Sequence, residues 1–171
     1  MNLKSFHVRK KLKLRDYKLN RYQYIKDPMS LALKLAKSCK DTDDVPVGCV
    51  IVDLNSKLIS YARNSVIRNN DVTAHAEILA IRSACNFLKS YRLSDYILYV
   101  TLEPCIMCEA AIHQSRIKKV FFGAYNQSFK QIQKNIKKKY YFSQKESQYF
   151  GGFSEDKSLK LIRSFFKEKR H

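Results

Sequence analysis

The sequence predicts an α/β protein: a three-layer α/β/α sandwich around a mixed five-stranded sheet. Helical and extended hydrophobic patterns alternate along most of the 171 residues, and this alternation is typical of a sheet covered by helices on both faces. The run from Tyr96 to Thr101 is almost entirely apolar, as expected of a strand that is buried on both faces. The length suffices for one domain with a hydrophobic core of its own.

A basic extension, residues 1–27, precedes a single predicted domain over 28–171. The first 26 positions contain nine Lys or Arg residues and one acid. The extension has one Ser and no clear amphipathic Arg pattern, which argues against an organelle transit peptide. The domain is predicted to begin with a helix at Asp27-Pro28. The apolar residues of this helix have helical spacing: Leu31, Leu35 and Ala36.

The next elements follow from the period of the apolar residues. In order, they are a strand over 47–52, a strand over 58–62, a loop over 63–72, a helix over about 74–88, a strand over 96–101, a helix over about 105–114 and a strand over 119–122. Asp71 or Thr73 is expected to cap the helix over 74–88, which places His75 in its first turn.

The region 127–153 has weaker patterns. Residues 130–139 could form a basic helix, and a last strand is expected somewhere in 140–153. Ser154 begins a C-terminal helix with a clear apolar side. This side contains Leu159, Ile162 and Phe166.

One His and two Cys have the spacing of a catalytic zinc site. His75-Ala76-Glu77 is followed by Pro104-Cys105-Ile106-Met107-Cys108. A structural zinc ion normally has four protein ligands, whereas His75, Cys105 and Cys108 leave the fourth position to a water molecule. Zinc would lower the pKa of that water and make it a nucleophile at neutral pH. Glu77 is the candidate proton shuttle, because it can reach the water without binding the metal.

The two halves of this motif are weak signals when taken separately. A lone His-x-Glu on an apolar helix is more often core packing with a surface carboxylate, and a lone Cys-x-x-Cys can be redox-active or structural. Together, with 26 residues between Glu77 and Pro104, they match the pattern of the zinc deaminases that act on nucleobases. The sequence therefore predicts a hydrolytic deaminase with one Zn²⁺ per subunit.

The composition favours a nucleic-acid partner and a reducing compartment. The formal net charge is +18, and residues 110–145 contain nine Lys or Arg residues and no acid. So basic a surface attracts polyanions, whereas a neutral nucleoside would gain nothing from it. An AT-rich genome could account for part of the charge but less well for its clustering.

Three cysteines in apolar contexts are expected to pack as small hydrophobic side chains: Cys39, Cys49 and Cys85.

No apolar run approaches the roughly 18 residues of a membrane span, and no apolar signal-peptide core follows the basic N-terminus. We therefore expect a cytoplasmic protein without a membrane partner.

Several stretches resemble the bacterial tRNA-specific adenosine deaminase family. They are Val45-Pro46-Val47-Gly48, Asn64, residues 73–78 (TAHAEI), residues 91–93 (YRL), residues 98–108 (LYVTLEPCIMC), residues 115–117 (SRI), residues 122–124 (FGA) and Phe165-Phe166. The resemblance is close over 28–126 and loose over 152–170. It implies the cytidine-deaminase fold, a homodimer, and conversion of the wobble adenosine of a tRNA anticodon, in most bacteria that of arginine tRNA, to inosine.

The resemblance also implies roles for individual residues. His75, Cys105 and Cys108 would bind zinc, with Glu77 as the proton shuttle. The residues implied to contact the anticodon stem-loop are Asn64, Ala76 through its backbone N–H, Asn126, Phe165, Lys167 and Arg170.

Asn126 marks a departure from the family, which usually has Asp near this position followed by a Gly-rich stretch. Here no glycine occurs between Gly123 and Gly151. Asn keeps a side-chain acceptor and adds a donor, so a ribose contact stays possible while selectivity for RNA should weaken. The alternative is that the altered loop moves Asn126 away from the pocket.

Two other functions use the same residues. A deaminase of free cytosine, guanine or a nucleoside would need the same zinc site but not the basic C-terminal helix. An inactive RNA-binding subunit is disfavoured by the intact Glu77.

Overall fold

A computed structural model describes residues 19–126 and 147–169 of the chain. Its strands form one sheet in the order β2-β1-β3-β4-β5. The strands are β1 (Gly48–Asp53), β2 (Leu58–Arg63), β3 (Tyr96–Leu102), β4 (Lys119–Ala124) and β5 (Gln148–Phe150). The helices are α1 (Pro28–Lys37), the 3-10 helix η2 (Ser38–Thr42), α2 (Val66–Asn69), α3 (Ala76–Leu88), α4 (Ile106–Gln114) and α6 (Glu155–Glu168).

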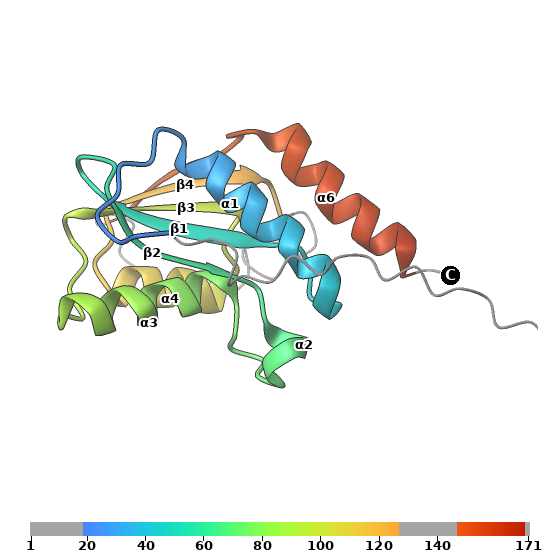
Figure 1. Cartoon of the computed structure of the whole chain (residues 1–171), viewed down its shortest axis with the longest axis horizontal. Helices are drawn as coiled ribbons and strands as arrows, with labels where there is room; N and C mark the ends of the chain where they lie inside the picture. The colour runs from blue at the N-terminus through green and yellow to red at the C-terminus, as the bar shows by residue number, and fades with distance from the viewer. Residues whose placement is uncertain (1–18, 127–146, 170–171) are drawn as a thin grey trace, which may run out of the picture.

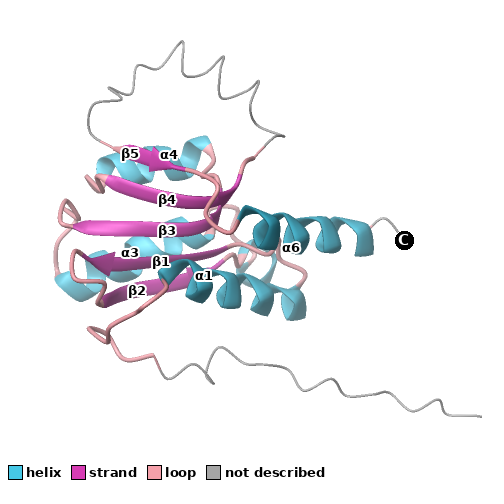
Figure 2. Cartoon of the chain, turned by 90° about the horizontal axis from the view of Figure 1, so that it is seen from above, coloured by secondary structure: helices cyan, strands magenta, loops and turns pink. Residues whose placement is uncertain are grey.

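Helices cover both faces of the sheet. Helices α1 and α6 lie on one face, and α3 and α4 lie on the other (Figures 1 and 2). The predicted three-layer sandwich around a mixed five-stranded sheet is therefore confirmed.

Strand directions bring several connections to one edge of the sheet. β1 is antiparallel to β2 and β3, whereas β3, β4 and β5 are parallel. β1 therefore begins where β2, β3 and β4 end, with Gly48 paired to Arg63 and Leu102 paired to Ala124. We call this the site edge. The residues that leave it are Asn64 after β2, Glu103 to Cys108 after β3, and Asn126 after β4.

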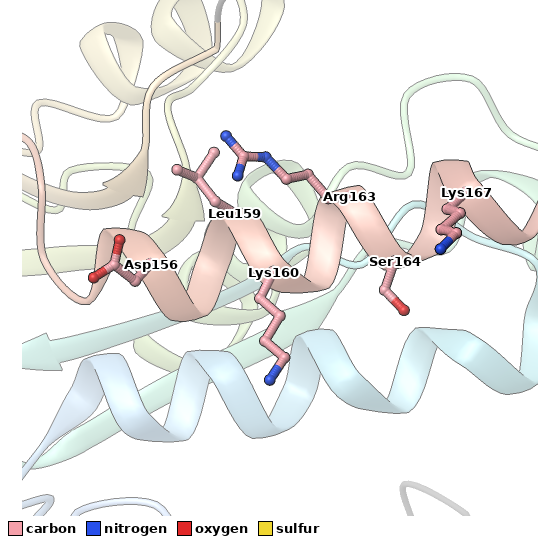
Figure 3. A pocket seen from close by; sticks show the side chains of 6 residues that line it. All are labelled: Asp156, Leu159, Lys160, Arg163, Ser164 and Lys167. Atoms are coloured by element: carbon pink, nitrogen blue, oxygen red, sulfur yellow. The ribbon is translucent and has the colours of Figure 1, made fainter.

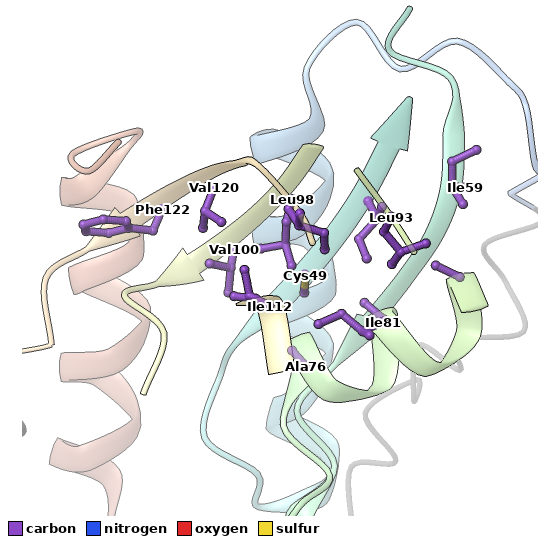
Figure 4. Packing of buried hydrophobic residues seen from close by; sticks show 14 of the residues in the cluster. Cys49, Ile59, Ala76, Ile81, Leu93, Leu98, Val100, Ile112, Val120 and Phe122 are labelled. Atoms are coloured by element: carbon purple, nitrogen blue, oxygen red, sulfur yellow. The ribbon is translucent and has the colours of Figure 1, made fainter. Parts of the chain in front are cut away.

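Side-chain alternation in β1 divides the core into two layers. Cys49 and Ile51 pack toward α3 and α4, and Val50 and Val52 pack toward α1. The α3 and α4 layer, which includes Ile112 of α4, is shown in Figure 4. Because both faces of β1 are buried, neither helix layer can shift along the sheet without losing apolar contacts.

Two glycines let helices approach the sheet closely. A Cβ atom at Gly48 would collide with the Ala32 carbonyl of α1, and a Cβ atom at Gly123 would collide with the Ser158 hydroxyl of α6. Larger side chains would push α1 and α6 off the sheet.

The start of α3 differs from the sequence prediction. The helix begins at Ala76, with His75 as an extended N-cap residue (φ −66°, ψ 151°), so His75 does not lie in the first turn. Asp71 and Thr73 were wrong as candidate caps. The Asp71 carboxylate instead accepts hydrogen bonds from the Thr73 N–H at 2.8 Å and the Thr73 hydroxyl at 2.7 Å.

A short helix and a short last strand lie in regions where the sequence pattern was weak or predicted a loop. The short helix α2 lies inside the predicted loop over 63–72, and β5 lies within 140–153, where a last strand was expected. The basic helix predicted over 130–139 lies outside the described residues.

The chain before α1 pairs along β2. The Tyr22 N–H donates to the Leu58 carbonyl at 2.7 Å, and the Leu58 N–H donates to the Gln23 carbonyl at 2.9 Å. Arg21 lies over the Phe87 ring of α3, with its guanidinium carbon 4.0 Å from the ring centroid. The end of the basic extension is thus attached to the domain. Among the described residues, no helix has the length and apolar content to cross a membrane.

Candidate active site

Three potential metal ligands converge at the site edge. The His75 Nδ1 atom lies 3.6 Å from the Cys105 Sγ and 3.5 Å from the Cys108 Sγ. Two bonds of about 2.3 Å and 2.05 Å that meet at a tetrahedral angle hold sulfur and nitrogen about 3.6 Å apart, so this spacing fits zinc. The cluster is the one group of His, Cys, Asp or Glu side chains among the described residues that could hold a metal ion.

Two helix N-termini hold the three ligands. His75 is the N-cap of α3 and Cys105 is the N-cap of α4, both with extended backbone, and Cys108 lies one turn into α4. The N–H groups at the start of a helix point away from its axis toward the N-terminus and favour negative charge there. The sequence spacing of the two Cys therefore places both sulfur atoms at the electropositive end of α4.

The two thiols of the cluster differ in how readily they lose a proton. A hydrogen bond from Cys108 is the main cause that lowers the pKa of Cys105 to about 4, with His75 adding to it. The same bond raises the pKa of Cys108, which keeps the shared proton. The hydrogen bond to Cys105 also raises the pKa of His75. Zinc binding needs both thiolates and neutral His75, so it would release the remaining protons.

Glu77 lies beside this cluster, in the first turn of α3. Its side chain is 4% exposed. Burial is the largest cause that raises the pKa of Glu77 to about 7, and the negative charge of Cys105 adds to it. A carboxyl group with a pKa close to neutral can both accept and donate a proton, which is what a proton shuttle requires.

Asn64 presents an unused hydrogen-bond acceptor. Its backbone N–H donates to the Val47 carbonyl at 2.8 Å, and its side-chain Nδ2 donates to the Val45 carbonyl at 3.2 Å. The side-chain Oδ1 is buried and has no hydrogen-bond partner among the residues that the structure describes. An unsatisfied buried acceptor is costly, and a donor on a bound molecule would satisfy it.

Ala76 and Asn126 belong to two segments that are connected to the ligands, one directly and one through Glu103. Ala76 is fully buried at the first position of α3, where a backbone N–H has no acceptor within its own helix. Asn126 is 9% exposed, and its backbone N–H donates to the Glu103 carboxylate at 2.9 Å. Glu103 precedes Pro104 and Cys105, so Asn126 is held beside the connection that carries the two Cys ligands.

The remaining predicted contacts belong to α6. Phe165 is half-buried, and its ring centroid lies 5.3 Å from that of Phe166. Lys167 is exposed and lines a pocket of about 390 Å³ on the outer side of this helix, shown in Figure 3. This pocket lies on α6 and does not include the ligand cluster. Arg170 lies outside the described residues.

The C-terminal turn of α6 is attached near the site edge. Lys169 forms an ion pair with Asp43 at 2.9 Å, and Glu168 forms one with Lys40 at 3.4 Å. Asp43 lies in the segment that leads into β1 at the site edge. The basic end of α6 and the ligand cluster therefore lie toward the same end of the molecule.

Comparison with known proteins places this geometry in a family. Residues 23–124 match the model of the cytidine and deoxycytidylate deaminase zinc-binding region. The chain is 44% identical to the tRNA-specific adenosine deaminase of Rickettsia bellii over 148 residues, which cover 83% of this chain and 99% of that protein. The chain belongs to the tRNA-specific adenosine deaminase family. Zinc is the cofactor of this family, and the His/Cys/Cys cluster fits it.

Solved structures agree with the family assignment. A structure from a study of A-to-I editing by tRNA:A34 deaminases matches with a TM-score of 0.69 and 39% identity, covering 78% of this chain and 97% of that one. A guanine deaminase of Bacillus subtilis matches with a TM-score of 0.57 and 30% identity, covering 84% and 92%. The cytidine-deaminase-like fold expected from the sequence is confirmed.

One group of residues near the family's motifs was missed by sequence reasoning. Asp44 is 1% exposed, and Arg63 is 5% exposed at the end of β2. The Arg63 guanidinium donates to the Ser38 carbonyl at the end of α1. Asp44 lies in the polar run before Val45-Pro46-Val47-Gly48, where an acid suggests an exposed turn. Only its position directly before that motif could have drawn attention to it.

Proposed function

We propose that the chain deaminates the wobble adenosine of a tRNA anticodon to inosine, releasing ammonia. The observation that carries this proposal is a three-ligand cluster beside a buried glutamate, in a chain 44% identical to a tRNA-specific adenosine deaminase. The basic composition supports a polyanionic substrate, because cationic groups attract phosphates over several ångströms.

In this proposal His75, Cys105 and Cys108 bind the zinc ion, and Glu77 moves protons. Bound zinc supplies a water molecule whose pKa is lowered toward neutrality, so that it can serve as the nucleophile. Glu77 takes one proton from the nucleophilic water and delivers it to the ring nitrogen. It then takes the second proton, from the hydroxyl group now on the ring carbon, and delivers it to the amine, which leaves as ammonia. Its burial keeps bulk water from competing for these protons.

The substrate contacts that we propose surround this cluster. The free acceptor of Asn64 takes a hydrogen bond from the flipped-out nucleotide, and the Ala76 N–H donates to the reacting base. Asn126 contacts the ribose in this proposal. Phe165, Lys167 and Arg170 contact the anticodon stem-loop, which is consistent with the attachment of α6 near the site edge.

A stem-loop assay tests this function. A synthetic anticodon stem-loop with the sequence ACG is incubated with the purified protein, and inosine is detected by sequencing, in which it is copied as guanosine. We expect conversion of the wobble adenosine alone. A stem-loop with adenosine moved to a neighbouring anticodon position is the matched control and should stay unmodified. Absence of inosine from the ACG stem-loop would contradict the proposal.

Guanine deamination is the second candidate, favoured by the 30% identity to the Bacillus subtilis enzyme. The same zinc site would serve it, and a free base is small enough to enter without the contacts on α6. Release of ammonia from guanine, at a rate unaffected by salt, would support this alternative.

Three finer points belong to the same proposal. Arginine tRNA is the expected substrate, since its ACG anticodon carries adenosine at the wobble position. The protein is expected to act as a homodimer with one zinc ion per subunit, and to work in the cytoplasm, where tRNA is available.

A further inference from the structure

A buried carboxylate, that of Asp44, contacts the connection between β2 and α3. Asp44 is 1% exposed, and both of its carboxylate oxygens accept hydrogen bonds. Oδ1 accepts from the backbone N–H of Ile67 at 2.7 Å, and Oδ2 accepts from the Thr42 hydroxyl at 2.7 Å. Burying a carboxylate is unfavourable unless such bonds compensate for the lost water. The interaction of Asp44 with Ile67 joins segments 23 residues apart in the sequence.

Asp44 provides the cap that helix α2 does not provide for itself. Ser65 is the N-cap residue of α2, but its side chain makes no capping hydrogen bond. The Ser65 hydroxyl donates instead to the Arg63 carbonyl at 3.3 Å. The Ile67 N–H would therefore lack an acceptor without Asp44, because the first N–H groups of a helix have none within it. The cap of α2 comes from another part of the chain.

Asp44 joins the segment that accepts the hydrogen bonds of Asn64 to the segment that contains Asn64. Val45, the residue after Asp44, accepts the Asn64 side-chain amide, and Val47 accepts the Asn64 backbone N–H. On the other side, Ile67 lies three residues after Asn64. Asp44 therefore fixes the distance between the carbonyls that orient the Asn64 amide and the helix that follows it.

This arrangement also reaches the metal-binding end of the connection. The Ser65 N–H donates to the Ala74 carbonyl at 3.0 Å, next to His75. With Nδ2 held by Val45, Oδ1 is the part of the Asn64 amide that is left for a ligand. The orientation of this acceptor thus depends on contacts that Asp44 holds together.

We infer that Asp44 is a positioning residue for substrate binding, acting through Asn64 and not on the reacting atoms. The inference rests on the proposed function, because it concerns the contact that Asn64 makes with the flipped-out nucleotide. A purely structural residue would change stability alone, whereas a positioning residue changes kcat/KM through Asn64.

A double-mutant cycle tests this inference. The variants Asp44→Ala, Asn64→Ala and the double variant are compared in kcat/KM for inosine formation on the ACG stem-loop. Loss of one oriented hydrogen bond predicts a decrease of about five- to tenfold for Asp44→Ala, with zinc content unchanged. In the Asn64→Ala background, Asp44→Ala should cause no further loss. A double variant whose loss equals the product of the single losses would overturn the inference.

Conservative and control variants separate positioning from folding. Asp44→Asn keeps an acceptor for the Ile67 N–H and should stay within about twofold of wild type. Ser60→Ala removes another buried hydrogen bond, from its hydroxyl to the Ala80 carbonyl, away from the site edge, and should leave kcat/KM unchanged. If Asp44→Ala does not fold, Asp44→Ser takes its place. The serine side chain is polar but too short for its hydroxyl to reach the Ile67 N–H.

Hydrogen exchange provides a measurement that does not depend on activity. Asp44→Ala should speed exchange of the backbone N–H groups of Ser65 and Ile67, and Ser60→Ala should not. Unchanged exchange would overturn the inference even with an active enzyme. If Asp44→Ala speeds exchange but the wild-type protein makes no inosine, Asp44 still holds the two segments together and only the proposed function is rejected.

Discussion

The ligand cluster at the site edge and the outer face of α6 differ in how they are held. Cys108 and Glu77 are buried, and the distances from His75 to the two sulfur atoms are within about 0.1 Å of those expected for zinc. On α6, Lys167 and Lys169 are exposed, and the helix presents its cations on a surface. Chemistry at the first region depends on tenths of an ångström, whereas attraction at the second acts over about 8 to 10 Å at moderate salt.

This difference predicts two distinct kinds of mutational effect. A change in the cluster should abolish the reaction and leave RNA binding intact. A change on α6 should weaken RNA binding in a salt-dependent manner and leave the reaction rate at saturation intact. The variants below are ordered from the largest expected effect to the smallest.

Removal of a metal ligand should have the largest effect. Cys105→Ala leaves two protein ligands, so zinc content measured by mass spectrometry of the metal should fall toward zero, with no detectable inosine. Cys85→Ala is the matched control, since Cys85 is a partly buried cysteine outside the cluster and should leave zinc content unchanged. Full zinc occupancy in Cys105→Ala would show that the cluster is not the metal site.

Removal of the proton shuttle should stop turnover and keep the metal. Glu77→Gln preserves size and hydrogen bonding but cannot accept a proton, so kcat should fall by about 10²- to 10⁴-fold. Zinc content and stem-loop affinity should stay at wild-type values. As a control, Glu109→Gln in α4 should keep kcat within about threefold. Near-normal deamination by Glu77→Gln would reject the assigned role.

Removal of charge from α6 should weaken binding without changing kcat. The combined variant Lys160→Ala, Arg163→Ala, Lys167→Ala neutralises the cations that line the pocket. The slope of log K against log salt is negative, and each lost phosphate contact should make it less steep by about 0.7 to 0.9. The salt dependence of stem-loop affinity measures this slope.

A second triple variant provides the control for charge alone. Lys57→Ala, Lys89→Ala, Lys118→Ala removes the same formal charge from exposed positions at the end of the sheet opposite the site edge. Its salt slope should match that of wild type. Equal slopes for both triple variants would show that α6 contributes only net charge.

Asn126 should have the smallest effect. Hydrogen bonds to a charged group contribute about 1.5 to 3 kcal/mol, against about 1 kcal/mol for neutral pairs. Asn126→Asp should therefore raise the preference for ribose over deoxyribose at the target nucleotide by about threefold to tenfold. Rates on matched stem-loops with either sugar measure this ratio. An unchanged ratio would remove Asn126 from the substrate contacts.

The sequence predicted those parts of the molecule that repeat a simple pattern. The apolar runs in β1 and β3 predicted buried strands, and the motif spacing predicted the His75, Cys105 and Cys108 cluster before any distance was known. These predictions succeeded because burial on both faces of a strand, or tetrahedral ligation, leaves few alternatives.

The features that the sequence could not predict depend on distant contacts. Helix α2 has four residues and is capped by Asp44, 23 positions earlier, so no local pattern marks it. The start of α3 at Ala76 differs from the prediction because Asp71 bonds to Thr73 and not to the helix. β5 has three residues, too few to show the period of a strand, so the sequence could place a last strand only within 140–153.

A competition assay tests the central claim most directly. One reaction contains the zinc-loaded protein, the ACG stem-loop and an excess of free guanine, and both inosine in the RNA and xanthine in solution are quantified over time. We predict inosine at the wobble position, formed with a kcat/KM at least about 100-fold above that for guanine. Xanthine formation that outpaces inosine would contradict the assignment of this site to tRNA editing.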